Sequence, residues 1–184
     1  MIRGTDRIRG EVTVTVRGPG GNIKRRKQNI VQRLLHIPGR KMVYRHHNTV
    51  TTQGEGLLAD WMLTSPTKAK VTNTTGYILV GTGWTGTSPK ANTTCNTVTG
   101  IYKGMNAGYP KTKAAFGVSG QNVVLYEATF AAGSLNANGI NETALLNGNT
   151  SAAQCLAYAQ VTPSVDVTSA DSLTIDWEIT MSGS

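Results

Sequence analysis

The chain has 184 residues, a charged fraction of 15% and a formal net charge of +8. This length supports one hydrophobic core, or one core with an arm, and the abundance of Gly, Thr and Asn favours short strands and polar loops over a helical bundle. No apolar run is long enough to cross a membrane, and the opening residues, MIRGTDRIRG, lack the apolar centre of a signal peptide. We therefore expect a protein that is made in a cytoplasm.

The first elements along the chain predict a hairpin. Residues 11–16, EVTVTV, alternate strictly between apolar and polar side chains, which predicts a strand with one apolar face. A turn cluster, RGPGGN, occupies residues 17–22. Residues 23–31 can then return as a second, strongly basic strand.

Charge is concentrated at the same end of the chain. Residues 1–45 contain 12 Lys and Arg against 2 acidic residues, whereas residues 46–184 contain 6 Lys and Arg against 8 acidic residues. We therefore predict two parts: a basic N-terminal arm and hairpin, residues 1–50, and a nearly neutral body, residues 51–184.

The basic segment predicts a docking element. Lys/Arg clusters gain affinity for nucleic acid by releasing counterions from phosphate, but residues 1–45 contain one aromatic residue, Tyr44, and no nucleic-acid-binding motif. Docking on an acidic protein neighbour, or a plain solvated surface, is therefore favoured, and nucleic acid binding is the alternative. The candidate docking residues are Arg3, Arg7, Arg9, Lys24, Arg25, Arg26 and Lys27.

One helix is predicted, over residues 51–63, TTQGEGLLADWML. Its apolar residues recur at helical spacing and share one face. The Thr-Ser-Pro sequence at residues 64–66 ends it.

The stretch 77-YILVGTGWTG-86 combines a predicted strand with the glycine spacing G-x-G-x-x-G. The dinucleotide-binding form of this motif needs a helix at the third glycine and an acidic residue about 20 residues later. The Thr- and Asn-rich continuation disfavours a helix, and no Asp or Glu occurs between Asp60 and Glu127. We therefore predict no cofactor, and interpret the glycines as a strand end that opens into a long loop, residues 84–122. Trp84 in this loop is a candidate anchor for a protein partner.

The last third of the chain predicts the fold class. Residues 123–130, 140–147, 153–161 and 171–182 read as four strands separated by turns, with no helix between them. Such spacing implies a mainly β protein, an antiparallel β-sandwich or barrel, and of the two we predict the sandwich.

No arrangement of side chains predicts a catalytic or metal site. The adjacent histidines at 46–47 point to opposite faces of a strand, so they do not share a metal easily. Cys95 and Cys155 are expected to be buried free thiols, with a disulfide as the alternative. Asp176 and Glu178 share a strand face, as the two carboxylates of a glycoside hydrolase would, but a solvent-facing polar stripe is the simpler interpretation. We predict a protein that is not an enzyme.

Three sequence blocks together resemble a group of structural proteins from the virions of tailed bacteriophages. They are the 11–31 hairpin followed by GEGLLADWML, the segment 77-YILVGTGWTGTSPKANTTCNT-97, and residues 127–148 with 155–183. The late hairpin carries the group's N-x-x-I-N/S-E-A-x-L-like turn, and the final strand its D-x-L-x-I-x-W-x-I pattern. The positions that match are Asn138, Ile140, Glu142, Leu145, Asp171, Leu173, Ile175, Trp177 and Ile179.

The resemblance implies a jelly-roll-like sandwich in a virion component that acts without catalysis. Members of the group are placed on capsids as decoration proteins, or on tails, baseplates and fibres. The basic N-terminal part favours docking on an acidic capsid surface, so we expect an auxiliary capsid protein that contacts other virion proteins and forms a homo-oligomer. A tail, baseplate or fibre component is the alternative.

Overall fold

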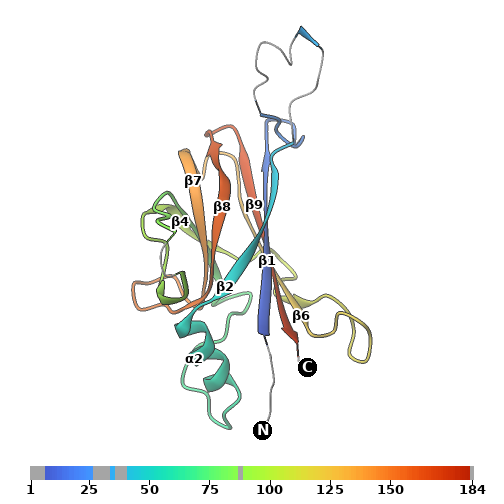
Figure 1. Ribbon diagram of the computed structural model, residues 1–184, viewed down its shortest axis with the longest axis vertical. Helices are drawn as coiled ribbons and strands as arrows, with labels where there is room; N and C mark the ends of the chain where they lie inside the picture. The colour runs from blue at the N-terminus through green and yellow to red at the C-terminus, as the bar shows by residue number, and fades with distance from the viewer. Residues whose placement is uncertain (1–6, 27–33, 36–40, 87–88, 183–184) are drawn as a thin grey trace.

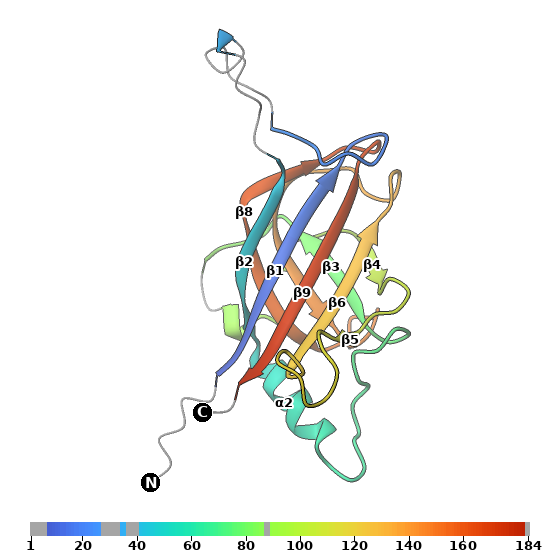
Figure 2. The same ribbon diagram turned by 90° about the vertical axis from the view of Figure 1, so that its right-hand side faces the viewer.

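The computed structural model describes residues 7–26, 34–35, 41–86 and 89–182. These residues form a mainly β protein in which nine antiparallel strands make one sheet (Figures 1 and 2). In sheet order the strands are β4 (Val98–Gly104), β3 (Tyr77–Gly81), β7 (Ala137–Leu146), β8 (Cys155–Val167), β2 (Val43–Val50), β1 (Arg7–Arg17), β9 (Ser172–Ser182), β6 (Val123–Phe130) and β5 (Lys111–Thr112). One α-helix, α2 (Thr52–Trp61), and a short 3-10 helix, η1 (Pro89–Ala91), complete the described part.

The sheet curls into a half-barrel, so that β3, β7 and β8 face β1, β9 and β6 across the core (Figure 1). The corner lies at β2, which pairs with β1 over residues 43–48 and with β8 over residues 48–50. The mainly β class is confirmed. Two separate sheets, as a β-sandwich would have, are not confirmed, because β2 joins both sides by hydrogen bonds.

Inward and outward side chains alternate along the strands, and the inward ones form the hydrophobic core. Val12, Val14 and Val16 of β1 are fully buried, as the pattern of residues 11–16 predicts. In β9 the inward residues are Leu173, Ile175, Trp177 and Ile179, all at most 2% exposed. Their neighbours across the strand register come from β1 and β6, so these three strands bury one continuous apolar surface.

Helix α2 confirms the helix predicted over residues 51–63. Thr51 caps it by accepting a hydrogen bond from the backbone N–H of Gly54 at 2.9 Å. Leu57 enters the core. Gly54 lies directly against β8, where a Cβ atom would be 2.0 Å from the carbonyl oxygen of Leu156, so this position needs glycine.

Two parts of the sequence prediction were wrong about strand pairing and strand content. β1 pairs with β2 and β9, not with a strand at residues 23–31. Ile23 and Arg25 form only isolated bridges, and residues 27–31 lie outside the described residues. The segment predicted as a long loop, 84–122, contains β4, β5 and η1. Both strands are irregular: β4 carries two glycines and a register shift against β3, and β5 has two residues.

Asn106, just after β4, closes part of the gap between the two edges of the half-barrel. Its backbone N–H donates to the carbonyl oxygen of Glu127 at 2.8 Å, and its side-chain Oδ1 accepts from the backbone N–H of Thr129 at 3.0 Å. Its Nδ2 also donates to the Glu127 carboxylate at 2.6 Å. Asn106 therefore takes the place of a paired strand at the edge of β6.

Candidate docking site

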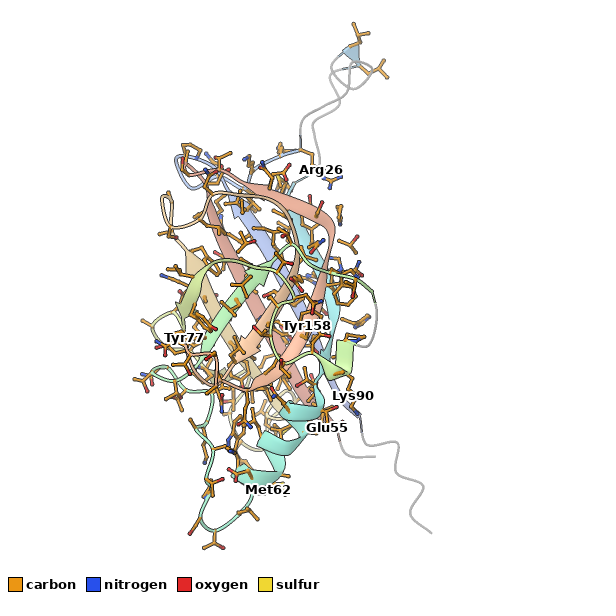
Figure 3. All side chains as sticks on the ribbon, turned by 90° about the vertical axis from the view of Figure 1, so that its left-hand side faces the viewer. Arg26, Glu55, Met62, Tyr77, Lys90 and Tyr158 are labelled. Atoms are coloured by element: carbon orange, nitrogen blue, oxygen red, sulfur yellow. The ribbon has the colours of Figure 1, made fainter. Side chains whose placement is uncertain are left out.

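The predicted basic docking residues gather where β1 ends and β2 begins. The chain turns at residues 18–22 and passes back over the strand end. There the N–H of Lys24 donates to the carbonyl of Val16, and the N–H of Met42 donates to the carbonyl of Lys24, both at 2.8 Å. Arg25 forms a bridge with Lys41. We call this end of the molecule, marked by Arg26 in Figure 3, the basic pole.

Lys24 forms an internal ion pair at this pole. Its Nζ donates to the carboxylate of Asp171, whose side chain is 2% exposed, and the hydroxyl of Thr168 donates to the same oxygen at 2.7 Å. Burial alone would raise the pKa of Asp171, but the hydrogen bonds from Lys24 and Thr168 outweigh it and hold the pKa below its usual range. Lys24 therefore fastens the returning segment to the turn before β9 rather than presenting its charge to a partner.

Arg26 lies against Tyr44 of β2. Its Nε donates to the Tyr44 hydroxyl at 3.1 Å, and its guanidinium carbon lies 5.8 Å from the ring centre. The guanidinium therefore covers the ring of Tyr44, the one aromatic residue in residues 1–45. That ring is less accessible to a stacking base.

Two pockets flank the returning segment and share Arg25. The first, of about 440 Å³, is lined by Arg17, Gly21, Asn22, Ile23, Arg25 and Lys41. The second, of about 520 Å³, is lined by Lys24, Arg25, Arg26, Met42, Asn138, Ser164, Asp166 and Thr168. The lining of the first pocket holds three cations and no carboxylate, whereas Asp166 contributes a carboxylate to the second.

The structure therefore brings part of the predicted set together and adds to it. Arg3 and Lys27 lie outside the described residues, and Arg7 and Arg9 lie in β1 with side chains that are not described. Arg17 and Lys41 belong to the pole but were not among the predicted residues. Their proximity depends on how β1 and β2 pair, which the sequence analysis did not predict.

The glycine loop after β3 binds an internal carboxylate. Glu142 of β7 is fully buried and accepts hydrogen bonds from the backbone N–H groups of Gly83 at 2.9 Å, Asn96 at 3.0 Å and Thr97 at 2.9 Å. The hydroxyl of Tyr158 donates to the same carboxylate. These N–H groups are the kind that would hold a phosphate in a nucleotide site, and here the chain supplies the anion itself.

The two glycines of this loop are needed for the close approach. A Cβ atom on Gly81 would lie 2.4 Å from Oε1 of Glu142, and one on Gly83 would lie 2.6 Å from the backbone nitrogen of Thr97. Further along, Lys90 of η1 pairs with Glu55 of α2 at 2.6 Å (Figure 3). The loop is thereby held on the outer face of the sheet.

Trp84, the candidate anchor, packs within the chain. Its ring stacks on that of Tyr158, with centres 5.3 Å apart and planes 19° from parallel. Its backbone N–H donates to Oδ1 of Asn141 at 2.9 Å. Trp84 is half-buried and helps cover a second apolar cluster around Leu79, Ala144 and Leu146. Its role toward a partner stays a prediction.

The carboxylates considered for glycoside hydrolysis are arranged differently from the pair in the sequence. Asp176 lies opposite Glu127 of β6 and hydrogen-bonds to it, whereas Glu178 pairs with Lys113 at 2.9 Å. Burial and then the Glu127 carboxylate raise the pKa of Asp176 to about 7. Hydrogen bonds from Asn106 and Asp176 outweigh burial at Glu127 and lower its pKa. The two groups therefore share one proton below about pH 7.

Histidines and cysteines take structural positions where they are described. Nε2 of His46 accepts a hydrogen bond from the backbone N–H of Thr162 at 3.2 Å, and burial, with the neighbouring His47, lowers its pKa. Cys95 and Cys155 are buried and free, as expected, and burial raises the pKa of both thiols. Within the described ranges, no group of three or more His, Cys, Asp or Glu side chains could hold a metal ion.

Comparison with known proteins returns no relative: no family model, no curated protein and no solved structure matches the chain. In the part of the chain that the structure describes, no helix is both long and apolar enough to cross a membrane.

Proposed function

We propose that this chain is a non-enzymatic structural protein of a tailed-phage virion, an auxiliary capsid (decoration) protein that docks through its basic pole. The observation that carries the proposal is the gathering of three cations, Arg17, Arg25 and Lys41, around one hollow where β1 ends and β2 begins. Exposed apolar side chains lie at both ends of the molecule: Leu34 and Leu35, 72% and 63% exposed, belong to the tip beyond this hollow (Figure 1), and Met62 lies at the opposite end (Figure 3).

At the end opposite the cations, the exposed apolar side chains lie at loop tips and at the end of a helix. Met62 and Leu63, at the end of α2, are 87% and 59% exposed, and Phe116 and Val118, in the loop before β6, are 99% and 55% exposed. Single exposed apolar residues are ordinary, but a fully exposed Phe between glycine-rich turns is of the kind that anchors protein contacts. A body with cations at one end and exposed apolar side chains at both ends is suited to contact neighbours in an assembly.

The filled glycine loop supports the same proposal. Glu142 occupies the backbone N–H groups that a cofactor phosphate would need, so the motif at 81–86 serves packing. The resemblance to phage structural proteins adds the virion setting and a jelly-roll-like sandwich as the parent architecture of the half-barrel. In this proposal, binding to the assembled capsid stabilises it, since a ligand of the assembled state shifts the assembly equilibrium, and many copies at symmetric sites add avidity.

Localisation on purified phage particles tests the proposal. We would raise antibodies against residues 111–122, which are largely exposed, and label intact particles with gold. Label spread over the head is the expected result. Label confined to the tail or its tip would replace the decoration role by that of a tail, baseplate or fibre component. Absence of the chain from disrupted particles as well would remove the virion proposal.

A further inference from the structure

We infer that the pocket lined by Arg17, Arg25 and Lys41 is the anion-binding centre of the basic pole, and that it takes a carboxylate side chain from an acidic, extended segment of a different protein. The proposed function supplies only the setting, in which that protein is a capsid component. The side chains that line the pocket determine the chemistry of the ligand.

The pocket is built for an anion. Arg17 lies at the end of β1, Arg25 lies in the returning segment, and Lys41 lies two residues before β2. Three separate backbone positions therefore place their cations around one hollow of about 440 Å³. All three residues are exposed. No carboxylate lines this pocket within the part of the chain that the structure describes. Three cations held around one hollow create a positive potential that attracts an external anion.

The backbone around the pocket is held in place. Nη1 of Arg17 donates to the carbonyl of Gly21 at 3.1 Å, and Gly21 and Gly18 are joined by a backbone hydrogen bond of 3.0 Å. The ion pair between Lys24 and Asp171 fastens the next part of the segment. The three cations therefore stand on a fixed frame, so that binding orders fewer groups than it would on a free arm.

A second copy of this chain is a poor partner for the pocket, because its carboxylates are matched internally. Asp6 lies outside the described residues, and each of the other nine acidic residues has a partner in the chain. The exposed pairs are Glu11 with Arg45, Glu55 with Lys90 and Glu178 with Lys113. Asp60 and Asp166 accept backbone N–H groups, and Glu127, Glu142, Asp171 and Asp176 are bonded as described above. The pairing of the described carboxylates therefore favours an acidic segment from a different protein.

The surroundings favour a protein over a nucleic acid. Asp166 lines the neighbouring pocket across Arg25, where it would repel the next phosphate of a continuous backbone. Tyr44, the aromatic residue in reach, is covered by Arg26. Stacking and an unbroken cationic track are the usual means of holding single-stranded nucleic acid, and the described residues of the basic pole provide neither. A peptide can place an acidic side chain in the first pocket and a neutral polar one in the second.

Binding of a model acidic segment tests the inference. The probe is a fluorescein-labelled peptide of ten glutamates, measured by fluorescence anisotropy against the full chain at 150 mM salt. The triple variant Arg17→Gln, Arg25→Gln, Lys41→Gln should bind it at least tenfold more weakly. The matched control, Lys68→Gln, Lys70→Gln, Lys111→Gln, removes the same charge from exposed positions elsewhere and should change affinity less than twofold.

Three results would overturn the inference. These are no measurable binding by the wild type, equal loss of binding in the two triple variants, or tighter binding of a 20-nucleotide DNA strand that is abolished by the pocket variant. If the pocket triple variant does not fold, Lys41→Gln alone should still weaken peptide binding about threefold. If the peptide does not bind but gold labels the head, the decoration role stands and the chain docks through a surface other than this pocket. Peptide binding without any label on particles would keep the pocket and remove the virion role.

Discussion

Glu142 is the residue on which the outer face of the sheet depends. It is fully buried, and its carboxylate organises three backbone N–H groups from two segments of one loop together with the hydroxyl of Tyr158. Each of those donors would be left without a partner if the carboxylate were removed, and a buried donor without a partner costs about 1–3 kcal/mol. The effect of a single substitution should therefore be unusually large.

We predict that Glu142→Ala lowers the free energy of unfolding by about 4 kcal/mol, at the upper end of single-site effects. Urea denaturation followed by tryptophan fluorescence measures it, and Trp84, which lies in the affected loop, should become more exposed. Glu178→Gln is the control, since its carboxylate is partly exposed and pairs with a surface lysine, where the loss should be within about 1 kcal/mol. Equal stability of the two variants would mean that the loop is held by its apolar contacts instead.

The raised pKa of Asp176 predicts how the stability of the fold changes with pH. Its pKa in the folded protein is raised to about 7, from about 4 in an unfolded chain. The folded state therefore binds more protons than the unfolded state between these values, and the stability from this group is present below pH 4 and lost as the pH rises to 7. The pKa of His46 is lowered in the folded protein, so the unfolded state binds more protons at this residue. Its contribution to stability is therefore lost as the pH falls below about 6.5, opposite in sign to that of Asp176.

The variant Asp176→Asn separates the two contributions, because asparagine keeps a hydrogen-bond donor toward Glu127 at every pH. The side chain is half-buried, so solvent screens the interaction, and we expect about 1 kcal/mol, or ~2–4 °C in melting temperature. Melting curves between pH 4 and 8 should show Asp176→Asn equal to the wild type at the acidic end and more stable at pH 8. Parallel pH profiles for both proteins would contradict the shared proton.

At the scale of elements, Asn106 is predicted to hold the edge of the half-barrel. Asn106→Ala removes the acceptor of the Thr129 N–H and the donor to the Glu127 carboxylate, which should cost about 1–2 kcal/mol. Hydrogen exchange should show faster exchange at the Thr129 amide than in the wild type. Asn92→Ala, which loses one hydrogen bond within a surface loop, is the control and should leave that amide protected.

How far the elements could be predicted depends on their own residues. β1 and β9 alternate strictly, β6 is a short run of residues that favour strands, and all three were found; Thr51 with the apolar spacing of residues 57–62 marked α2. β2 was missed because its inward side carries Tyr44, His46 and Asn48 rather than aliphatic residues, so the period-2 signal is lost. β4 was missed because of its two glycines.

The candidate sites were predictable to the same extent. Arg25 and Arg26 were found from local charge density, but Arg17 and Lys41 join them only through strand pairing across the turn. Glu142 was noted as part of a hairpin pattern. Its role as the anion of the glycine loop could not be predicted, because Gly83 lies 59 residues away in the chain and long-range contacts leave no spacing signal.

At the scale of the whole molecule, the position of β1 and β2 determines what can be cut away. β1 lies between β2 and β9 in the middle of the sheet, and its Val12, Val14 and Val16 belong to the core. The connection between the strands is different, because the bridge between Arg25 and Lys41 brings its two ends side by side. Removing residues 1–50 should therefore destroy the fold, whereas shortening the connection between β1 and β2 should leave it intact.

We predict that deleting residues 1–50 abolishes folding, whereas replacing residues 27–40 with a four-residue Gly/Ser linker changes the melting temperature by less than about 3 °C. The deletion removes three fully buried valines and leaves β8 and β9 with unpaired edges, a loss larger than the ~5–15 kcal/mol that holds a domain of this size together. The linker variant keeps the pocket of Arg17, Arg25 and Lys41 while removing Lys27. Circular dichroism and size-exclusion chromatography measure both variants. A folded 51–184 fragment would show that the N-terminal part is an arm separable from the body, and unfolding of the linker variant would show that the connection is part of the core structure.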